Sequence, residues 1–173
     1  MKAKMKYIII ISSFFLLSSI SHAQTKEETL EWLNNNLNIL LPTTHCNGIN
    51  GKETAIDNFK IENDSLIFKE EWQGTRDYSV AIKDILYMES NINDFSDKPS
   101  FESCPENVYF YFKSKKDKVI ITTTFKTGNK SKDLRDIFLM PYKKENKDNA
   151  MRVVKAIMHL AKLSGATQNK QTF

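Results

Sequence analysis

The 173-residue sequence predicts an α+β fold in which a helix near each end flanks an antiparallel body of seven strands. Three observations support this fold class. A helix-capping signal precedes leucines at helical spacing before residue 42, apolar residues alternate with polar ones over residues 54–142, and a long amphipathic segment follows residue 146. A period of two is the repeat of a pleated strand, and the connections are too short for parallel crossovers. We therefore expect the strands to form a barrel or a two-sheet body.

Residues 1–23 precede this domain and have the pattern of a secretory signal peptide. Three lysines stand before an apolar run over residues 7–20, and Ser21-His22-Ala23 closes it. The run is shorter than the roughly 20 apolar residues of a membrane-spanning helix, and its small closing residues suit signal peptidase. We expect a mature chain that begins at Gln24, is secreted or periplasmic, is soluble, and forms a single domain over residues 24–173 without a transmembrane segment.

The charge of the mature chain is nearly balanced. Removal of the leader takes three lysines and no acidic residue from 25 basic and 21 acidic residues, which leaves a net charge of about +1. Nucleic-acid-binding domains carry a strong basic excess on one face. The composition therefore argues against a nucleic-acid partner.

The first helix is expected to begin after Thr25. Thr25 and Glu28 form a capping box, in which each side chain accepts a backbone N–H of the first turn. Leucines then recur at helical spacing to residue 41, with Trp32 beside them, and Pro42 prevents continuation.

Seven strands are expected between residues 54 and 142, where the apolar period changes to two. Their apolar faces are Phe59 and Ile61; Leu66, Phe68 and Trp72; Tyr78, Val80 and Ile82; residues 85–88; Val108, Phe110 and Phe112; Val119, Ile121, Thr123 and Phe125; and residues 136–142.

The closing helix is expected over residues 146–164, with Gly165 as its left-handed C-terminal cap. At 100° per residue its polar side chains fall into one stripe about 80° wide. This stripe contains Arg152, Lys155, His159 and Lys162, and the apolar arc contains Ala150, Val153, Val154, Ile157, Leu160 and Ala161. We expect the apolar arc to pack on a curved sheet and the basic stripe to be a solvated, structurally incidental surface.

This order of strands and closing helix resembles the pleckstrin-homology superfold, in which a helix plugs one end of a two-sheet barrel. The segments 152–165 (RVVKAIMHLAKLSG) and 28–33 (ETLEWL) are also similar to the terminal helices of uncharacterised secreted proteins from Bacteroidetes-type bacteria. The resemblance implies a pleckstrin-homology-like domain and brings no functional residues with it.

Inositol-phosphate binding, the best-known function of that superfold, is not expected here. It needs a basic first hairpin, whereas the hairpin over residues 60–69 has the acidic turn Asn63-Asp64. Fold alone does not carry function.

Cys46 and Cys104 are the two cysteines of the chain, and both are expected on loops. An exported protein permits a disulfide between them, and closing a loop of about 60 residues stabilises by on the order of 4 kcal/mol in the chain-entropy model. The alternative is two unpaired thiols. We do not expect Cys104 and His159 to form a catalytic pair, because neither stands in a nucleophile motif, and no CxxC or HxxxH spacing indicates zinc.

An acidic segment over residues 89–106 is one candidate interaction surface. It lacks periodicity and contains Asp94 and Asp97 among five acidic residues against a single lysine, Lys98. Long loops of this kind are uncommon unless they bind something. The alternative is a solvated loop held by Cys104.

Two lysine clusters form a second candidate surface. An antiparallel meander with the expected strands would place both at one end, where they could contact an anionic surface; the alternative is a solubilising rim. The clusters are Lys113, Lys115, Lys116 and Lys118, and Lys143, Lys144 and Lys147.

These observations together predict a non-enzymatic exported domain without a cofactor that binds another protein of the cell envelope through its sheet edges or its long loop. The competing hypothesis is a carrier of a small hydrophobic ligand, with a cavity lined by Phe110, Phe112 and Phe125. The sequence does not specify the oligomeric state.

Overall fold

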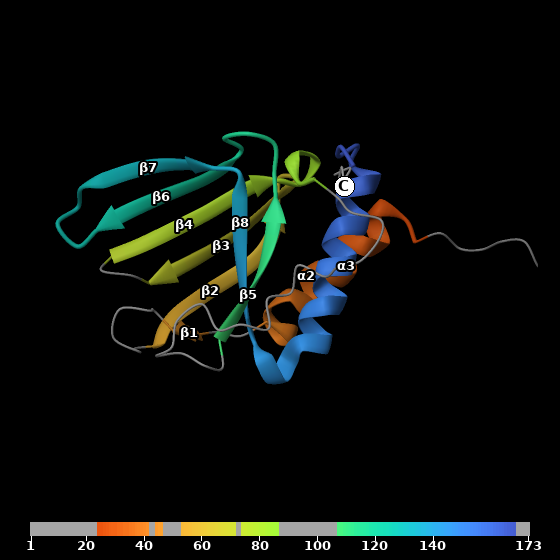
Figure 1. Cartoon of the computed structure of the whole chain (residues 1–173), viewed down its shortest axis with the longest axis horizontal. Coiled ribbons are helices and arrows are strands. Elements are labelled where there is room, and N and C mark those ends of the chain that lie inside the picture. Colours follow the sequence, from red (N-terminus) through yellow and green to blue (C-terminus); the bar gives the residue numbers. More distant parts are fainter. Residues whose placement is uncertain (1–23, 42–43, 47–52, 72–73, 87–106, 169–173) are drawn as a thin grey trace, which may run out of the picture.

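A computed structural model describes residues 24–41, 44–46, 53–71, 74–86 and 107–168. It confirms the α+β fold class, with an N-terminal helix, a C-terminal helix and two antiparallel sheets (Figure 1). Helix α2 covers Lys26–Leu40 and α3 covers Lys147–Leu163. The leader, Asp94, Asp97 and Cys104 lie outside the described residues, so the expectations for them stay predictions.

A six-stranded sheet forms most of the body. Its strands, in spatial order, are β1 (Thr44–Cys46), β2 (Glu53–Glu62), β3 (Ser65–Glu71), β4 (Gly74–Ala81), β6 (Val119–Phe125) and β7 (Lys130–Arg135). The second sheet pairs β5 (Asn107–Lys113) with β8 (Ile137–Lys143), which cross the larger sheet at a steep angle in Figure 1. Short 3-10 helices, η1 and η2, occupy Ile82–Asp84 and Lys144–Asn146.

The expected count of seven strands is wrong, because the described residues contain eight. The strand expected over residues 85–88 is reduced, within its described part, to one bridge between Ile85 and Ser114. In its place β1 and β7 are added. Strand β7 was not predicted from the alternation of polar and apolar residues, because all six of its residues are exposed and its sequence shows no such alternation. In the described part of the chain the strands form two separate sheets rather than a closed barrel.

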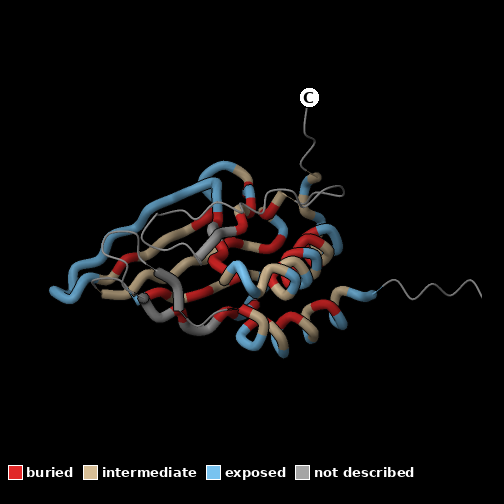
Figure 2. The backbone as a smooth tube through the Cα atoms, turned by 60° about the horizontal axis from the view of Figure 1, so that its bottom comes forward, coloured by how far each residue is buried: buried red, intermediate tan, exposed pale blue. Residues whose placement is uncertain are grey.

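The hydrophobic core lies between the larger sheet, the β5–β8 pair and the two helices. A column of aromatic rings connects the layers. The Phe68 ring stacks on the rings of Phe59 and Tyr78, at centroid distances of 4.9 and 4.3 Å. The Phe138 ring of β8 packs edge-on against the Phe68 ring at 5.2 Å. Such pairs contribute about 0.5–1.5 kcal/mol beyond their area burial. Figure 2 shows the resulting division, with buried backbone where the layers meet and an exposed run from the end of β6 through β7.

Helix α2 forms as its sequence predicts and packs antiparallel to α3. The Thr25 Oγ1 accepts the Glu28 N–H at 3.1 Å and the Glu28 carboxylate accepts the Thr25 N–H at 2.9 Å, which confirms the capping box. Leu33 and Leu37 are fully buried against the core. The C-terminal end of α3 also agrees, because Gly165 adopts φ +78° after the last turn. Neither helix is long and apolar enough to cross a bilayer, nor is any other helix among the described residues.

Helix α2 also covers one edge of the larger sheet. Strand β2 shifts register between Asp57 and Lys60, and β1 pairs only with its first three residues. Beyond β1, the Asn38 side chain donates to Phe59 O at 2.9 Å and the Ile61 N–H donates to the Asn34 side chain at 3.2 Å. Side chains of α2 therefore satisfy backbone groups that a neighbouring strand would otherwise take.

Replacing Asn38 by Ala should lower the free energy of unfolding by about 1 kcal/mol, because the Phe59 carbonyl loses its donor in a partly buried place. Asn35→Ala is the matched control, since Asn35 is exposed on the same helix, whereas the hydrogen bonds from α2 to the described part of β2 come from Asn34 and Asn38. Urea melts measure both. Equal stabilities of the two variants would contradict this role of Asn38.

Candidate functional site

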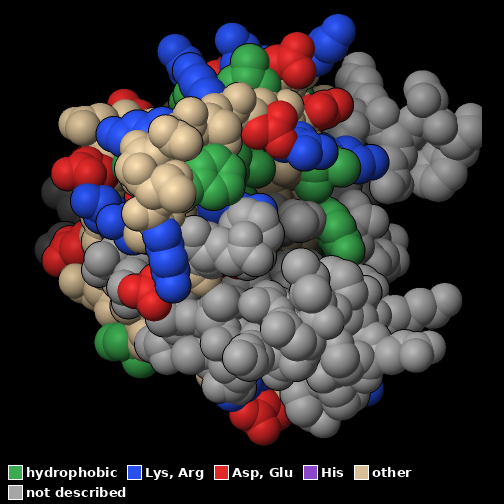
Figure 3. Space-filling model, turned by 90° about the vertical axis from the view of Figure 1, so that its left-hand side faces the viewer, with side chains coloured by type: hydrophobic (Ala, Val, Ile, Leu, Met, Phe, Trp, Pro, Cys, Tyr) green, Lys and Arg blue, Asp and Glu red, His purple; other side chains and the backbone are tan. Residues whose placement is uncertain are grey.

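Strand β7 is the open edge of the six-stranded sheet and the first candidate site. Within the described residues it pairs with β6 alone, and all six of its side chains are exposed. Large apolar side chains stand exposed around it: Phe125 at 37%, Leu134 at 46% and Ile137 at 46%. Figure 3 views the molecule from this side, where basic and acidic side chains surround small apolar patches.

The register identifies which backbone groups of β7 face outward. The Phe125 N–H donates to Asn129 O at 2.9 Å immediately before the ladder begins. Hydrogen-bonded and non-hydrogen-bonded pairs alternate in an antiparallel ladder. Ser131, which faces Thr123, therefore bonds to β6, and so do the residues at every second position after it. The N–H and C=O groups at the alternate positions, Lys130, Lys132 and Leu134, point away from the sheet.

The two faces of β7 differ in charge. Ser131, Asp133 and Arg135 share the inner face, where the Arg135 Nε donates to Asp133 Oδ2 at 2.7 Å and the two charges compensate each other. Lys130, Lys132 and Leu134 share the outer face, and neither lysine has a carboxylate partner among the described residues. The outer face of the open edge is therefore basic with one apolar side chain.

The two lysine clusters expected to converge lie at opposite ends of the β5–β8 pair. Lys113 pairs with Ile137 at one end and Lys143 pairs with Asn107 at the other. Six steps of about 3.3 Å along the strand place the two ends roughly 20 Å apart. The expectation was wrong because β7 was missing from the strand count, and one additional strand reverses the end at which β8 leaves the sheet.

The lysines of the two clusters consequently do not form one surface. Lys115 donates to Asp84 Oδ1 at 3.1 Å and to the Lys83 carbonyl at 3.3 Å, so it holds the β5–β6 turn against η1. Lys116 beside it is exposed, and Lys143 and Lys144 belong to the far end. That either cluster alone contacts a partner stays a prediction.

The three phenylalanines expected to line a carrier cavity are not brought together either. Phe110 and Phe112 are fully buried on β5 and pack edge-on at a centroid distance of 4.6 Å. Phe125 stands exposed at the far end of β6. For the cysteines, Cys46 closes β1, its side chain lies outside the described part of the chain, and the disulfide to Cys104 stays a prediction.

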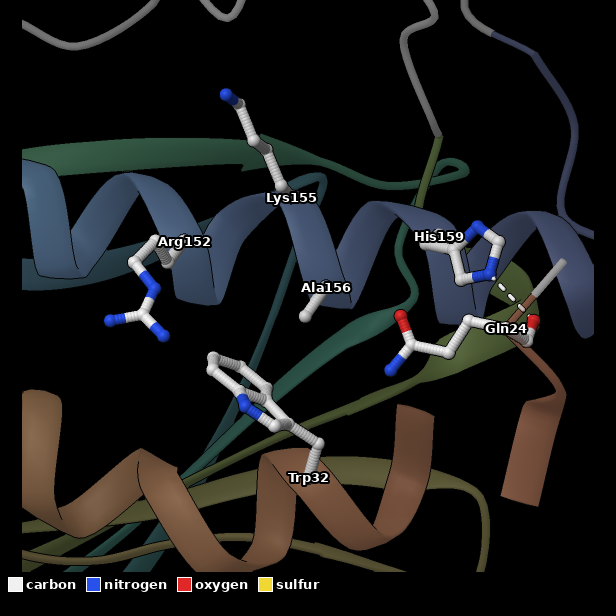
Figure 4. Close-up of a pocket in the computed structure, with 6 residues that line it drawn as sticks. All are labelled: Gln24, Trp32, Arg152, Lys155, Ala156 and His159. Carbon is white, nitrogen blue, oxygen red and sulfur yellow. Dashed lines mark hydrogen bonds between the residues drawn. The ribbon is translucent and has the colours of Figure 1, made fainter. Parts of the chain in front are cut away.

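A pocket between α2 and α3 is the second candidate site (Figure 4). It has a volume of about 360 Å³ and is lined by Gln24, Trp32, Arg152, Lys155, Ala156 and His159. The Arg152 guanidinium lies 5.7 Å from the centre of the Trp32 ring, and the His159 Nε2–H donates to the Gln24 carbonyl at 3.0 Å. The basic stripe of α3 was expected to be a solvated surface, and Arg152, Lys155 and Lys162 are indeed exposed. His159 differs, because its ring is half-buried and bonded to the segment before α2. Sequence reasoning missed the pocket because it depends on the tertiary pairing of two helices.

A buried polar cluster lies on the inner face of the larger sheet. Glu70 is only 5% exposed, and the Tyr78 hydroxyl donates to its carboxylate at 2.7 Å. Arg76 faces Glu70 across the β3–β4 ladder. Burial, followed by the negative charge of Glu70 and the hydrogen bond to it, raises the pKa of Tyr78 well above its ordinary value. One signal in the sequence could have indicated this cluster. The alternation of β3 places Glu70 on the same face as the apolar residues Leu66 and Phe68.

Replacing Tyr78 by Phe should cost about 1–3 kcal/mol of stability at pH 7, because a buried carboxylate loses a donor. The raised pKa adds a pH dependence. The folded state favours the neutral phenol, so this contribution is complete below the ordinary tyrosine pKa of about 10 and is lost as the pH rises above it. Thermal melts from pH 7 to 11 should therefore show a steeper alkaline loss for the unsubstituted protein than for Tyr78→Phe. Tyr111→Phe is the control, and parallel curves for all three proteins would refute the assignment.

Among the described residues no group of three or more His, Cys, Asp or Glu side chains lies close enough together to hold a metal ion. The chain matches no protein-family model, no curated protein and no solved structure. Its function must therefore be argued from its own residues.

Proposed function

We propose that this protein is an exported, non-enzymatic interaction domain that binds an extended segment of another envelope protein by adding a strand to β7. Leader residues 1–23 direct export in this proposal, and the body is a divergent pleckstrin-homology-like domain related to the secreted Bacteroidetes-type proteins. The observation that carries the proposal is the open edge itself, with outward backbone groups at Lys130, Lys132 and Leu134.

The contrast between the two edges of the sheet supports this reading. Exposed edges invite non-specific pairing, and proteins usually cover them. Here β1 and the asparagines of α2 cover the β2 side, whereas β7 runs six residues with every side chain exposed. An added strand obtains its affinity from main-chain hydrogen bonds and its specificity from alternate side chains.

The outer face of β7 indicates the chemistry of the partner segment. Lysines on an edge strand oppose pairing with most strands, including another copy of β7, because like charges would then face each other. A segment with acidic side chains beside Lys130 and Lys132 and an apolar one beside Leu134 would complement this face. The proposal therefore specifies an acidic, partly apolar extended segment.

Lys132→Pro should abolish this binding and leave the fold intact. Proline removes the outward N–H of Lys132 without removing a β6–β7 hydrogen bond, and edge strands tolerate it. Affinity capture from the envelope of the source cells, quantified by mass spectrometry, compares this variant with the unsubstituted protein and with Lys132→Ala.

The expected result is a partner retained by the unsubstituted protein and, more weakly, by Lys132→Ala, but at least about tenfold depleted with Lys132→Pro. Thermal melts of the baits show whether each variant is folded. A partner captured equally by Lys132→Pro would exclude β7 as its docking strand.

A further inference from the structure

We propose that the pocket between α2 and α3 binds a small organic carboxylate that carries a planar apolar group. This pocket lies at the helical end of the molecule, whereas β7 lies at the opposite end of the sheet (Figure 1). The inference therefore does not depend on the function proposed for β7.

The basic groups of the pocket have no acidic partner among the described residues. The guanidinium of Arg152 contacts the Trp32 ring, and neither it nor the Lys155 ammonium lies within 4 Å of a described carboxylate. A guanidinium presents a planar fork of N–H donors that matches the two oxygens of a carboxylate. Arg152 thus supplies the charge and the geometry for the anionic end of a ligand. Lys155, one turn further along α3, points away from Trp32 in Figure 4 and adds a positive charge only at the rim of the pocket.

The rest of the pocket suits an apolar body. Figure 4 shows Ala156 pointing toward Trp32, with the Gln24 amide pointing into the same space from the side of His159. The Trp32 ring and the Ala156 methyl form an apolar floor, and the Gln24 amide provides neutral polar contacts at the far end. A volume of about 360 Å³ falls within the range of small-molecule sites, roughly 300–1,000 Å³.

The available donors favour a carboxylate over a phosphate. Phosphate sites commonly use free backbone N–H groups at a helix N-terminus. The nearby N-terminus of α2 is already capped, because Thr25 and Glu28 satisfy each other's backbone N–H groups. The pocket therefore offers a side-chain fork on the flank of α3 rather than a nest of backbone amides.

Benzoate is the probe that tests this inference, because benzamide has the same shape without the charge. In ¹⁵N-labelled protein the indole N–H signal of Trp32 reports on the pocket floor. We expect a saturable shift with benzoate and a Kd on the order of 1 mM. Benzamide and inorganic phosphate should bind at least about tenfold more weakly, and 0.5 M NaCl should weaken benzoate binding.

Arg152→Gln/Lys155→Gln should weaken benzoate binding at least about tenfold, whereas Lys116→Gln/Lys118→Gln, which removes two exposed charges that do not line the pocket, should leave it unchanged. Preserved dispersion of the amide spectrum shows that each variant is folded. The salt and benzamide comparisons need no variant, so they test the proposal even if a substitution disturbs the fold. A linear, non-saturating shift, equal binding of benzamide, tighter binding of phosphate, or undiminished binding by the folded Arg152→Gln/Lys155→Gln variant would each overturn the assignment.

Discussion

Ile157→Asp should not fold. Ile157 stands in the middle of α3, is completely buried, and belongs to the core that the helix shares with the sheets. Aspartate would remove apolar contacts worth about 2–5 kcal/mol and would bury a carboxylate without a partner at a further cost of about 3–5 kcal/mol, roughly 5–10 kcal/mol together. A domain of this size has a total stability of about 5–15 kcal/mol, so the native state would be largely depopulated.

Two residues further along the same helix, His159→Ala provides the control. The His159 ring is half-buried and makes one hydrogen bond, to the Gln24 carbonyl, so its loss should cost about 0.5–1 kcal/mol. Far-ultraviolet circular dichroism with thermal melts compares the two proteins. A cooperative melt of Ile157→Asp within about 5 °C of the unsubstituted protein would show that α3 does not hold the core.

Gly74→Ala should lower the melting temperature by about 10 °C. Gly74 begins β4 with φ +142°, and it pairs with Phe125 of β6. A Cβ at this position would lie 2.1 Å from the Thr124 carbonyl oxygen and 2.9 Å from the Phe125 Cα, both of them backbone atoms that cannot move independently. We expect a loss of about 2–4 kcal/mol from the disturbed β4–β6 pairing and the strained φ.

Gly128→Ala separates the contribution of φ from that of the close contact. Gly128 also has a positive φ, +85°, in the β6–β7 turn, but an added Cβ meets no atom within 4 Å there. Strain alone should cost about 1 kcal/mol. If Gly128→Ala destabilised the protein as much as Gly74→Ala, the backbone contact at Gly74 would not be the cause.

The two helices could be predicted from the sequence because their signals are local. The capping box of Thr25 and Glu28, the leucine spacing, the wide apolar arc of α3 and the cap at Gly165 each lie within a few residues of the structure that they specify. Strands with one buried face, such as β3, were likewise visible in the alternation of Leu66 and Phe68.

Strand β7 could not be predicted in this way, because no face of it is buried and its stability comes from pairing with β6. The missing strand also caused the wrong prediction for the two lysine clusters. Without β7 the exit of β8 was placed at the wrong end, and Lys143 was expected beside Lys115. The α2–α3 pocket and the Glu70–Tyr78 cluster depend on contacts between segments far apart in the chain, which periodicity does not encode.

Photo-cross-linking in the source cells tests the proposed strand addition at β7 most directly. A photoreactive amino acid at Lys132 should give one covalent adduct with an envelope protein, and Leu134→Pro in the same chain should abolish it, since Leu134 also directs its N–H outward. The same amino acid at Lys60, exposed on β2 of the same sheet, should give none. No adduct from Lys132, an equal yield from Lys60, or an adduct that survives Leu134→Pro would contradict docking at this edge.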